Sequence, residues 1–436
     1  MAEQSYILHT GVESNAVKRL QMAKEASQKI QSFEEGQAII FDRVISPLSR
    51  DSFLSEFWDK SFLRLVGYKG KFASLLSWDE LNVILKQHRL LPSQLKLFRD
   101  GKQIDSRLYM AANKGRRRLN PGALINLLSE GATLILDNID ELSPAVGELT
   151  EAFEEILRSR ALVNVYAGWR TQKGYDLHWD DHDTAILQVS GRKHWKVYPP
   201  TRLHPFNDDV EVSPTPTGAP AWEGIVEDGD MLYLPRGWWH VAFPLDEPSL
   251  HLTVTIIPAD GTDFLRWVIE RLKSFPEIRM NVPHLASDTD RKRYVSKLRQ
   301  RLNEAWDDDA LETFIAEWES NIPLPPRIDL PSAPVESRSA ITLETRIRLA
   351  SSRRLAFSGT PTDGTTSFVA GGIRGECSTE LVPALAELRG TASCSVEELC
   401  AHLPDQGATS KLIIVLTALV MRGVLQIEHQ EGSESV

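Results

Sequence analysis

The sequence predicts an α+β protein built around a double-stranded β-helix, an antiparallel sandwich or barrel of jelly-roll type. Short apolar strands separated by turn residues follow one another between about residues 162 and 258. Apolar residues at helical spacing dominate before and after that region. A proline-rich stretch from Pro323 to Pro334 is typical of a linker and predicts a further unit behind it.

The region before the jelly roll is predicted to mix helices and strands. Residues 11–38 carry scattered apolar positions among charged ones, which predicts a helical lead-in. Ser49–Trp58 is typical of a capped helix, and Phe62–Leu65 of a short strand. Ser77 with Glu80 three residues later is a capping-box pattern, which predicts that another helix begins there.

Two further elements lead into the jelly roll. The apolar run Ala132–Leu136 predicts a buried strand, and Ser143-Pro144 predicts the start of a helix. This helix carries four apolar residues at helical spacing, which are Leu149, Phe153, Ile156 and Leu157. The strands expected in the jelly roll itself are Val163–Ala167, Thr184–Val189, His194–Tyr198, Met231–Leu234 and Leu250–Ile257.

The chain is predicted to become helical again after Asp260, and Tyr294–Trp318 carries an apolar stripe. Three helices followed by a strand are then expected beyond the linker, at Leu381–Leu388, Ser395–Leu399, Ser410–Met421 and Gly423–Ile427. This order predicts a winged-helix-like domain. The predicted divisions are 1–260 with a barrel core at about 130–260, 261–325 as a helical region, 326–345 as the linker and 346–436 as the last domain.

Composition narrows the class of protein. The net charge of -11 argues against general nucleic-acid affinity, and the basic clusters at residues 114–118 and 346–354 are expected to be solvated surface. The three cysteines match no zinc spacing, so they are expected to be reduced. No run approaches the roughly 18 apolar residues of a membrane span, and the first residues lack the pattern of a signal peptide. These features predict a cytoplasmic protein.

The most informative motif joins His178-Trp179-Asp180 to a distant histidine. In an extended segment successive side chains point to opposite faces, so His178 and Asp180 share a face while Trp179 turns away. His240 follows the turn Pro235-Arg236-Gly237, which ends an apolar strand. We therefore expect His240 to approach the other two from a neighbouring strand.

Two imidazoles and one carboxylate form the facial triad that binds non-haem Fe(II) and leaves coordination positions open. Open positions indicate catalysis, because a bidentate cosubstrate and dioxygen can both reach the metal. His178, Asp180 and His240 are therefore predicted to be metal ligands and catalytic residues. A lone histidine in a strand is more often structural, and only the combination favours the metal site.

Lys193 is the predicted partner of a cosubstrate carboxylate, because a dicarboxylate in a buried pocket needs a cation. The residues Thr184–Trp195 predict a hairpin, in which Lys193 begins the return strand and can point inward as a compact positive charge. The alternative is that Arg192 and Lys193 are both solvated cations of the turn.

Pairs of polar residues two positions apart share a face of their predicted strand. Asn164 and Tyr166 form one pair and Thr253 and Thr255 another, and a bound keto acid would provide hydrogen-bond partners for them. Thr253 and His251 can equally be structural hydrogen-bonding residues. The remaining candidates His182, His194 and His204 are predicted not to be ligands, because each lacks a carboxylate on its face with a matching distant histidine.

Together these motifs resemble those of the JmjC-type cupin oxygenases, specifically the ribosomal oxygenase group. The resemblance rests on the metal motifs above, on Asp183, and on the runs Gln188–Trp195, Gly229–His240 and Ser249–Thr253. The bulky Trp179 and the pair Trp238-Trp239 depart from that pattern, and residues before about 160 contribute no motif.

The resemblance implies Fe(II) at His178, Asp180 and His240, and 2-oxoglutarate that chelates the metal with its far carboxylate on Lys193. Asn164 and Tyr166 fall where the family places polar residues of the pocket. The implied reaction uses dioxygen to hydroxylate a side chain of a protein or peptide, while 2-oxoglutarate is converted to succinate and carbon dioxide. The substrates that the resemblance implies are ribosomal proteins. The resemblance also implies that residues 261–325 pair two subunits into a homodimer and that a winged helix follows.

Three alternatives stay open at this point. The chain can be a hydroxylase of a small molecule or a biosynthetic peptide, which the sequence does not separate from a protein hydroxylase. It can be a non-catalytic metal-binding cupin that acts as a regulator through its last domain. A manganese or zinc cupin of the isomerase type is the third, although such sites usually contain more imidazoles.

Overall fold

The computed structural model describes residues 38–113, 116–209, 216–322, 341–350, 355–362, 364–388, 393–405 and 407–428. The predicted lead-in helix before residue 38 and the proline-rich linker lie outside these ranges. The chain divides into two compact units, one at Gly36–Pro258 and one that contains Ala259–Val436, and each is described by itself. Among the described residues no helix is both long and apolar enough to cross a membrane.

The first unit begins with short helices and a strand. Residues 38–45 are helical, and Ser49 caps a helix that starts as α2 (Arg50–Ser52) and widens into a π-helix at Phe53–Phe57. The Ser77 hydroxyl caps α3 (Trp78–Gln87) by accepting from the Glu80 amide, as predicted. The Glu80 carboxylate, however, accepts from Ser143 at 2.8 Å, so it ties α3 to a later helix. The other helices here are α4 (Pro121–Ser129), α5 (Pro144–Leu157) and the 3₁₀ turns Ser106–Leu108 and Ile139–Glu141.

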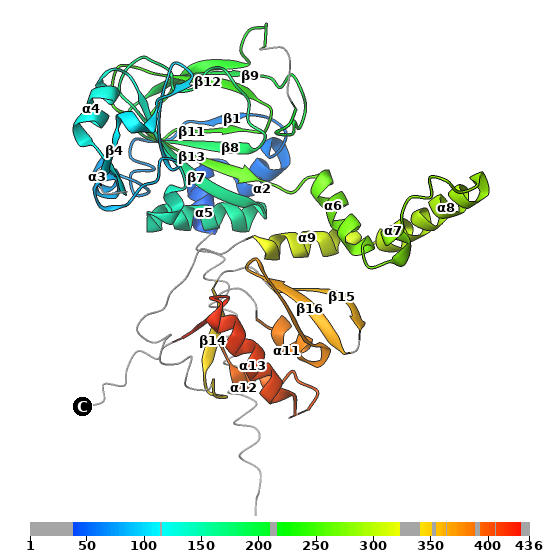
Figure 1. The fold of residues 1–436 in the computed structure, drawn as a ribbon. Helices are drawn as coiled ribbons and strands as arrows, with labels where there is room; N and C mark the ends of the chain where they lie inside the picture. The colour runs from blue at the N-terminus through cyan, green and yellow to red at the C-terminus, as the bar shows by residue number, and fades with distance from the viewer. Residues whose placement is uncertain are drawn as a thin grey trace, which may run out of the picture. The chain divides into compact units, whose positions relative to one another are not determined.

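An antiparallel sheet forms the centre of this unit (Figure 1), with the strand order β1-β11-β8-β13-β7-β6-β2-β3 among the described residues. These strands are β1 (Leu63–Leu65), β2 (Leu95–Arg99), β3 (Lys102–Gln103), β6 (Thr133–Leu136), β7 (Arg160–Gly168), β8 (Asp183–Ser190), β11 (Met231–Leu234) and β13 (Ser249–Ile257). The strands predicted in the jelly roll are all present, each within a few residues of its predicted ends. A separate hairpin is formed by β4 (Met110–Asn113) and β5 (Arg116–Leu119).

A smaller sheet in the order β10-β9-β12 faces the central one. Its strands are β9 (Lys193–Tyr198), β10 (Trp222–Val226) and β12 (Trp239–Pro244). The two sheets are joined by a buried apolar cluster that takes Ile186, Leu232 and Leu234 from the large sheet and Trp195, Val197 and Val226 from the small one. The predicted fold class is therefore observed for this unit: two antiparallel sheets packed face to face, with mixed helices around them.

The side chains of β7 alternate between the apolar core on one face of the central sheet and a cavity on the other. Val163, Val165 and Ala167 are buried in the core shared with α5, whereas Asn164 and Tyr166 are only partly buried and point to the opposite face. The central sheet is thus buried on one face by helices and lines a cavity with the other.

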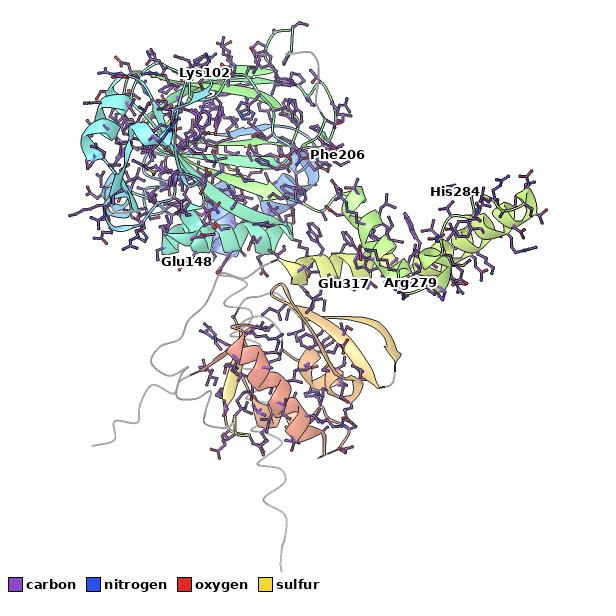
Figure 2. All side chains as sticks on the ribbon, in the orientation of Figure 1. Lys102, Glu148, Phe206, Arg279, His284 and Glu317 are labelled. Atoms are coloured by element: carbon purple, nitrogen blue, oxygen red, sulfur yellow. The ribbon has the colours of Figure 1, made fainter. Side chains whose placement is uncertain are left out.

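Phe153 anchors the core between α5 and the N-terminal helix. Its side chain is fully buried, and its ring meets that of Phe41 at 5.0 Å. We expect Phe153→Ala to lower the free energy of unfolding of this unit by about 3–5 kcal/mol, because the change removes buried apolar contacts and leaves a cavity. Urea unfolding followed by tryptophan fluorescence measures this change. Glu148→Ala, on the exposed face of the same helix (Figure 2), should change stability by less than about 0.5 kcal/mol, and equal losses for both variants would contradict this assignment of the core.

The second unit opens with helices, as predicted after Asp260. They are α6 (Gly261–Leu272), α7 (Pro276–Arg279), α8 (Asp288–Ala305) and α9 (Ala310–Asn321). Asp260 and Asp263 form a complete capping box at the start of α6. The predicted stripe Tyr294–Trp318 is divided between α8 and α9, and aromatic contacts join Phe264 of α6 to Phe314 of α9.

The last part of the chain contains the predicted helices and more strands than predicted. The helices are α11 (Val382–Ala386), α12 (Val396–Cys400) and α13 (Ala408–Met421), with a 3₁₀ turn at Thr379–Leu381. The predicted final strand is β19 (Leu425–Ile427), and it pairs with β14 (Arg346–Leu349), which also pairs with β18 (Cys394–Ser395). A further sheet contains β15 (Ala356–Thr362), β16 (Thr365–Ala370) and β17 (Ile373–Ser378). All three cysteines are free thiols, as expected.

Candidate active site

Backbone hydrogen bonds join the segment of His178 to the segment of His240. His178 and His240 exchange two hydrogen bonds, from the His178 amide to the His240 carbonyl at 3.2 Å and from the His240 amide to the His178 carbonyl at 2.7 Å. The prediction that His178 and Asp180 lie on a strand is wrong, because this isolated bridge is the only pairing of their segment. Asp180 lies outside this bridge, but its carbonyl accepts from the Gly237 amide at 2.9 Å and its carboxylate faces both imidazoles.

The three side chains converge in one place. Their candidate ligand atoms all lie within 4.8 Å of one another. The Nε2 atom of His178 lies 3.8 Å from one oxygen of Asp180, and the Nε2 atom of His240 lies 3.6 Å from the other. His240 is 10% exposed and His178 35%, so the site opens to solvent on the His178 side. Two imidazole nitrogens and a carboxylate at such separations suit a divalent metal with open positions.

Backbone carbonyls orient both imidazoles. The Nδ1 atom of His178 donates to the Asp176 carbonyl at 2.7 Å, and that of His240 donates to the Trp238 carbonyl at 3.1 Å. Because a carbonyl only accepts, each Nδ1 carries the proton and each Nε2 lone pair faces the other ligands. Such outer partners fix the tautomer that a metal requires. Neither carbonyl can be inferred from the sequence motif, because both belong to irregular segments.

Charges within the triad suit metal binding near neutral pH. Burial, reinforced by the neighbouring His178, lowers the pKa of His240 to about 4, so this imidazole is neutral. Burial alone would raise the pKa of Asp180, but the adjacent imidazoles outweigh it and lower that pKa below its ordinary value. The site therefore provides a neutral imidazole beside an ionised carboxylate.

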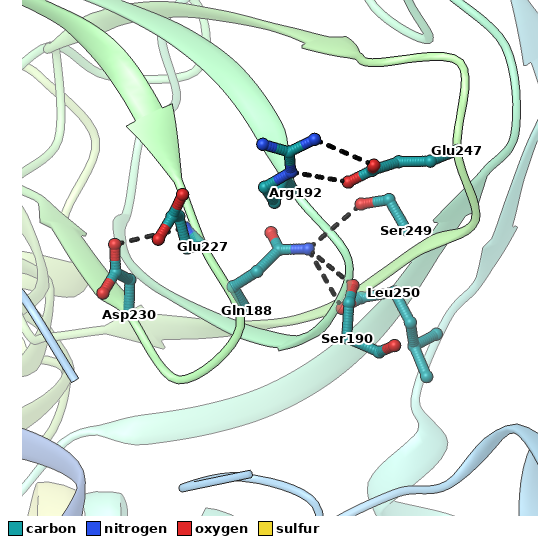
Figure 3. Close-up of polar contacts among 8 residues, drawn as sticks. All are labelled: Gln188, Ser190, Arg192, Glu227, Asp230, Glu247, Ser249 and Leu250. Atoms are coloured by element: carbon teal, nitrogen blue, oxygen red, sulfur yellow. Dashed lines mark hydrogen bonds and ion pairs between the residues drawn. The ribbon is translucent and has the colours of Figure 1, made fainter. Parts of the chain in front are cut away.

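A tight hairpin places Lys193 at the start of β9. The turn between β8 and β9 contains Gly191 at φ +68, where a Cβ would lie 2.0 Å from the Pro248 carbonyl oxygen. The buried Gln188 amide secures the turn by donating to Ser190, Ser249 and Leu250 (Figure 3).

Arg192 and Lys193, adjacent in this hairpin, point in opposite directions. Arg192 forms a 2.9 Å ion pair with Glu247 on the surface, as expected for a solvated cation of a turn (Figure 3). Lys193 is 3% exposed and lines the cavity, and no carboxylate forms an ion pair with it among the described residues. Burial lowers the pKa of Lys193 to about 7. A buried ammonium without a counter-charge is costly, and a carboxylate ligand would remove that cost.

The four polar residues of β7 and β13 lie on one face of the central sheet. Strand register places Thr253 opposite Asn164 and His251 opposite Tyr166, with Thr255 two residues further along β13. All four predicted residues line the same cavity as Lys193 and the triad. Asn164 has a structural role as well, because its side-chain oxygen accepts from the Asn138 amide at 3.0 Å.

The cavity between the two sheets has a volume of about 590 Å³. The metal triad and Lys193 both belong to its wall, so a small dicarboxylate in this space can reach both. A cavity of this size, in which many polar side chains converge beside apolar ones such as Ile186 and Ala242, has the character of a site for a polar small molecule. The volume also leaves room for a side chain of a second molecule.

Several wall residues were not predicted as parts of the site, and four of them lie close to the predicted ones. Tyr175 lies 5.4 Å from His178 between ring centroids and follows no strand pattern, so no sequence signal marks it. Trp195 shares the inward face of β9 with Lys193, and the spacing of two positions could have identified it. His251 stacks on Tyr166 at 4.9 Å. The fourth is Thr184, which stands opposite Thr255.

Unpaired polar atoms in the wall support a bound ligand. The His251 Nδ1 and Trp195 Nε1 atoms are buried without a hydrogen-bond partner. Burial, together with the nearby Lys193, holds the pKa of His251 well below its ordinary value, so this imidazole is neutral and does not neutralise any anion by itself. Unsatisfied buried groups are uncommon in native proteins, and these two belong to the same cavity wall as Lys193.

The three histidines predicted not to bind metal each contact a carboxylate outside the triad, and one of them, His182, also lines the cavity. His182 contacts Asp181 at 2.9 Å, His194 contacts Glu223 at 3.1 Å, and His204 contacts Asp59 at 3.4 Å. Within the described part of the chain the triad is the one cluster of three potential ligands found.

Comparison with known proteins agrees with this geometry. Residues 141–264 match the JmjC domain family. The bifunctional lysine-specific demethylase and histidyl-hydroxylase NO66 of Drosophila pseudoobscura pseudoobscura is 28% identical over 242 residues, which cover 55% of this chain and 25% of that protein. The NO66 protein of Aedes aegypti is 26% identical over 303 residues, covering 63% of this chain and 46% of that protein. The chain thus spans between a quarter and a half of the length of these relatives.

Solved structures with the same fold include YcfD, a ribosomal oxygenase from Escherichia coli. Its complex with cobalt and 2-oxoglutarate superposes with a TM-score of 0.52 at 19% identity, covering 88% of this chain and 99% of that chain. Its complex with cobalt and succinic acid gives a TM-score of 0.53 at the same identity and coverage. At this level of identity the likeness shows a shared fold.

Proposed function

We propose that this chain, whose residues 141–264 match the JmjC domain and which is similar to ribosomal oxygenases, is an Fe(II)- and 2-oxoglutarate-dependent dioxygenase that hydroxylates a side chain of a protein or peptide. The observation that carries the proposal is one cavity with two features: the triad His178, Asp180 and His240, and the buried, unpaired Lys193. A metal triad alone fits many reactions, but a second, cationic anchor in the same cavity specifies an anionic cosubstrate.

The residues fit the proposed metal and cosubstrate. His178, Asp180 and His240 would hold Fe(II) by two nitrogens and one oxygen, with the Asp176 and Trp238 carbonyls fixing the imidazoles. When bound, iron and 2-oxoglutarate would supply the oxidising chemistry, in which dioxygen is consumed, 2-oxoglutarate becomes succinate and carbon dioxide, and one oxygen atom is added to the substrate.

The chain's own residues would bind and orient the cosubstrate. Lys193 would pair with the far carboxylate and set how deep the molecule enters. The phenol of Tyr166 stays protonated, because burial and the nearby Tyr175 and Asp180 raise its pKa well above the ordinary value, so it serves as a hydrogen-bond donor. Asn164, Thr253 and Thr255 would offer further polar contacts along the same wall. Apolar Ile186 and Ala242 would limit the entry of water.

A protein substrate is supported by the similar proteins, which are named as a histidyl-hydroxylase and a ribosomal oxygenase. The test is to incubate the protein with Fe(II), 2-oxoglutarate and dissolved 50S and 30S ribosomal proteins, and to follow each protein by intact mass. The proposal predicts a gain of one oxygen atom on a specific protein, with stoichiometric succinate, and neither with His178→Ala. Succinate formed only with added small molecules would favour a small-molecule hydroxylase, and no succinate above a metal-free control would favour a regulator.

The affinity for 2-oxoglutarate should depend on pH through Lys193. A bound carboxylate stabilises the ammonium, so the pKa of Lys193 rises above about 7 on binding, and binding above pH 7 takes up a proton. The KM for 2-oxoglutarate should therefore be flat below pH 7 and rise by up to about tenfold per pH unit above it. Steady-state assays at saturating iron check this. Lys193→Arg should remove the rise, because arginine stays protonated, and an equal rise in both proteins would contradict the assignment.

Residues 261–325 would form the dimerisation region of a homodimer, and residues 346–436 a winged-helix-like domain. The first assignment is supported by exposed apolar side chains on the helices and on the segments that join them. They are Leu265, Ile269, Met280, Val282, Leu285, Val295, Leu302, Trp306 and Leu311. Arg279, which ends α7, and His284, which lies in the segment between α7 and α8, are labelled in Figure 2. Apolar surface at this density is typical of an interface. The second is supported by the sheet β18-β14-β19 beside α12 and α13. The net charge of -11 favours protein over nucleic acid as its partner.

The homodimer predicts a specific loss of association. Wild-type protein should sediment as a dimer at micromolar concentration, and the double variant Val282→Glu with Leu285→Glu should sediment as a folded monomer, because it places two charges in the apolar interface. A wild-type monomer, or a dimer unaffected by both changes, would contradict this role of the helices.

A further inference from the structure

We propose that Asp183 is a positioning residue of the metal centre, which fixes the turn that delivers His240 to His178 and Asp180. The proposal rests on the metal-binding part of the proposed function and not on the identity of the substrate. Asp183 opens β8, directly after the segment that carries two of the ligands, and its side chain is fully buried. A carboxylate is rarely buried to this extent unless specific donors hold it.

The first donor belongs to the turn before His240. The Arg236 amide donates to Oδ1 of Asp183 at 2.8 Å, and the next amide, that of Gly237, donates to the Asp180 carbonyl at 2.9 Å. Two consecutive residues of the turn are therefore tied to the segment that runs from Asp180 to Asp183. The turn and the ligand segment are far apart in the sequence, so these bonds set their relative position.

The second donor anchors the carboxylate to the apolar core. The Tyr233 hydroxyl donates to Oδ2 of Asp183 at 2.6 Å and accepts from the Asp59 amide at 3.0 Å. The Tyr233 ring is fully buried and packs against Phe53 and Trp58, at 5.1 and 5.9 Å between centroids. The Asp183 carboxylate thus connects the packed Tyr233 side chain to the turn before His240.

The backbone of the turn leaves little freedom for His240 to adjust. Gly237 has φ +85, and a Cβ there would lie 2.8 Å from Pro205. Pro205 therefore restricts the position of the turn, in addition to Asp183. His240 lies only three residues after Gly237, and its Nδ1 donates to the Trp238 carbonyl within the same short stretch. A shift of the turn would therefore move the imidazole relative to His178 and Asp180, and metal affinity is sensitive to such shifts.

The test is titration of the full-length apoprotein with Co(II), whose visible absorption reports both affinity and coordination geometry. Asp183→Ala removes both hydrogen bonds, and we expect about a 10- to 100-fold loss of cobalt affinity with a changed spectrum. Asp183→Asn keeps an oxygen for the Arg236 amide and should recover to within about threefold of wild type. If Asp183→Ala does not fold, Tyr233→Phe keeps the ring packing, removes the anchor and should lower the affinity at least about fivefold.

Asp230→Ala is the matched control. Asp230 is also a buried carboxylate of this unit that accepts from backbone amides. These are the amides of Gly67 at 2.9 Å and of Glu227 at 3.1 Å, the second of which is drawn in Figure 3. No hydrogen bond joins the Asp230 carboxylate to the turn before His240 among the described residues. This variant should lose stability and keep the cobalt affinity and spectrum of wild type. Equal cobalt affinity in Asp183→Ala and wild type, or equal losses in Asp183→Ala and Asp230→Ala, would overturn the role of Asp183. A wild-type protein that binds no cobalt would instead overturn the proposed metal site.

Discussion

Asp180→Ala is expected to abolish metal binding and with it all succinate formation. Asp180 supplies the only carboxylate of the triad, and its two oxygens lie 3.8 and 3.6 Å from the two imidazole nitrogens. Its removal leaves two imidazoles without a carboxylate, and such a pair binds Fe(II) weakly. The loss of affinity should exceed the roughly 10–100-fold that is typical of an outer-shell partner. Isothermal titration with Fe(II) under anaerobic conditions, followed by a succinate assay, measures both effects.

Asp181→Ala is the control for this experiment. Asp181 is the next residue in the chain, but its carboxylate binds His182 at 2.9 Å and is not part of the cavity wall. This variant should bind Fe(II) within a few-fold of wild type. Substantial succinate formation by Asp180→Ala would show that the chemistry does not depend on the triad.

Lys193→Met is expected to give the second largest effect, and it should act on the cosubstrate rather than on the metal. Methionine fills a similar volume but has no charge, so the far carboxylate of 2-oxoglutarate would be buried without a partner. Such a loss typically costs about 2–5 kcal/mol, which corresponds to at least about a 30-fold rise in the dissociation constant. Competition binding with 2-oxoglutarate on the metal-loaded protein measures it, while Fe(II) affinity without 2-oxoglutarate should stay near the wild-type value.

Lys196→Met is the matched control on the same strand. Lys196 lies three positions further along β9, pairs with Glu223 at 3.0 Å and is not part of the cavity wall. It should leave the affinity for 2-oxoglutarate unchanged. If both lysine variants bind 2-oxoglutarate as wild type does, the anchor of the far carboxylate is not Lys193.

Helices and strands whose apolar residues recur at a regular spacing are predicted well from the sequence. Alternation in β7 and β13 and helical spacing in α5 specify both the element and the face that is buried. The smaller strands are missed for a physical reason. The edge strand β10 contains Gly224 and exposes the apolar Ile225, so its sequence does not alternate between apolar and polar residues, and β16 begins with polar Thr365 and Thr366 that are typical of a loop.

In the candidate site, too, some residues are marked by a sequence pattern and others are not. The residues His178, Asp180 and His240 can be found because close spacing and a preceding turn mark them, and Lys193 because a hairpin signal precedes it. The tautomer-fixing carbonyl of Asp176 and the wall residue Tyr175 cannot be found, because both lie in an irregular segment whose path is set by packing. The strand expected at His178 is only a single bridge to His240, in a segment without regular secondary structure on either side.

The central claim is that one cavity binds iron and 2-oxoglutarate together. It is tested most directly by adding Fe(II) and then 2-oxoglutarate to the anaerobic protein and recording the visible absorption. We predict a metal-to-ligand charge-transfer band that requires both additions, is absent in His178→Ala, and needs at least about 30-fold more 2-oxoglutarate in Lys193→Met. A wild-type protein that gives no band at saturating Fe(II) and 2-oxoglutarate would contradict the account.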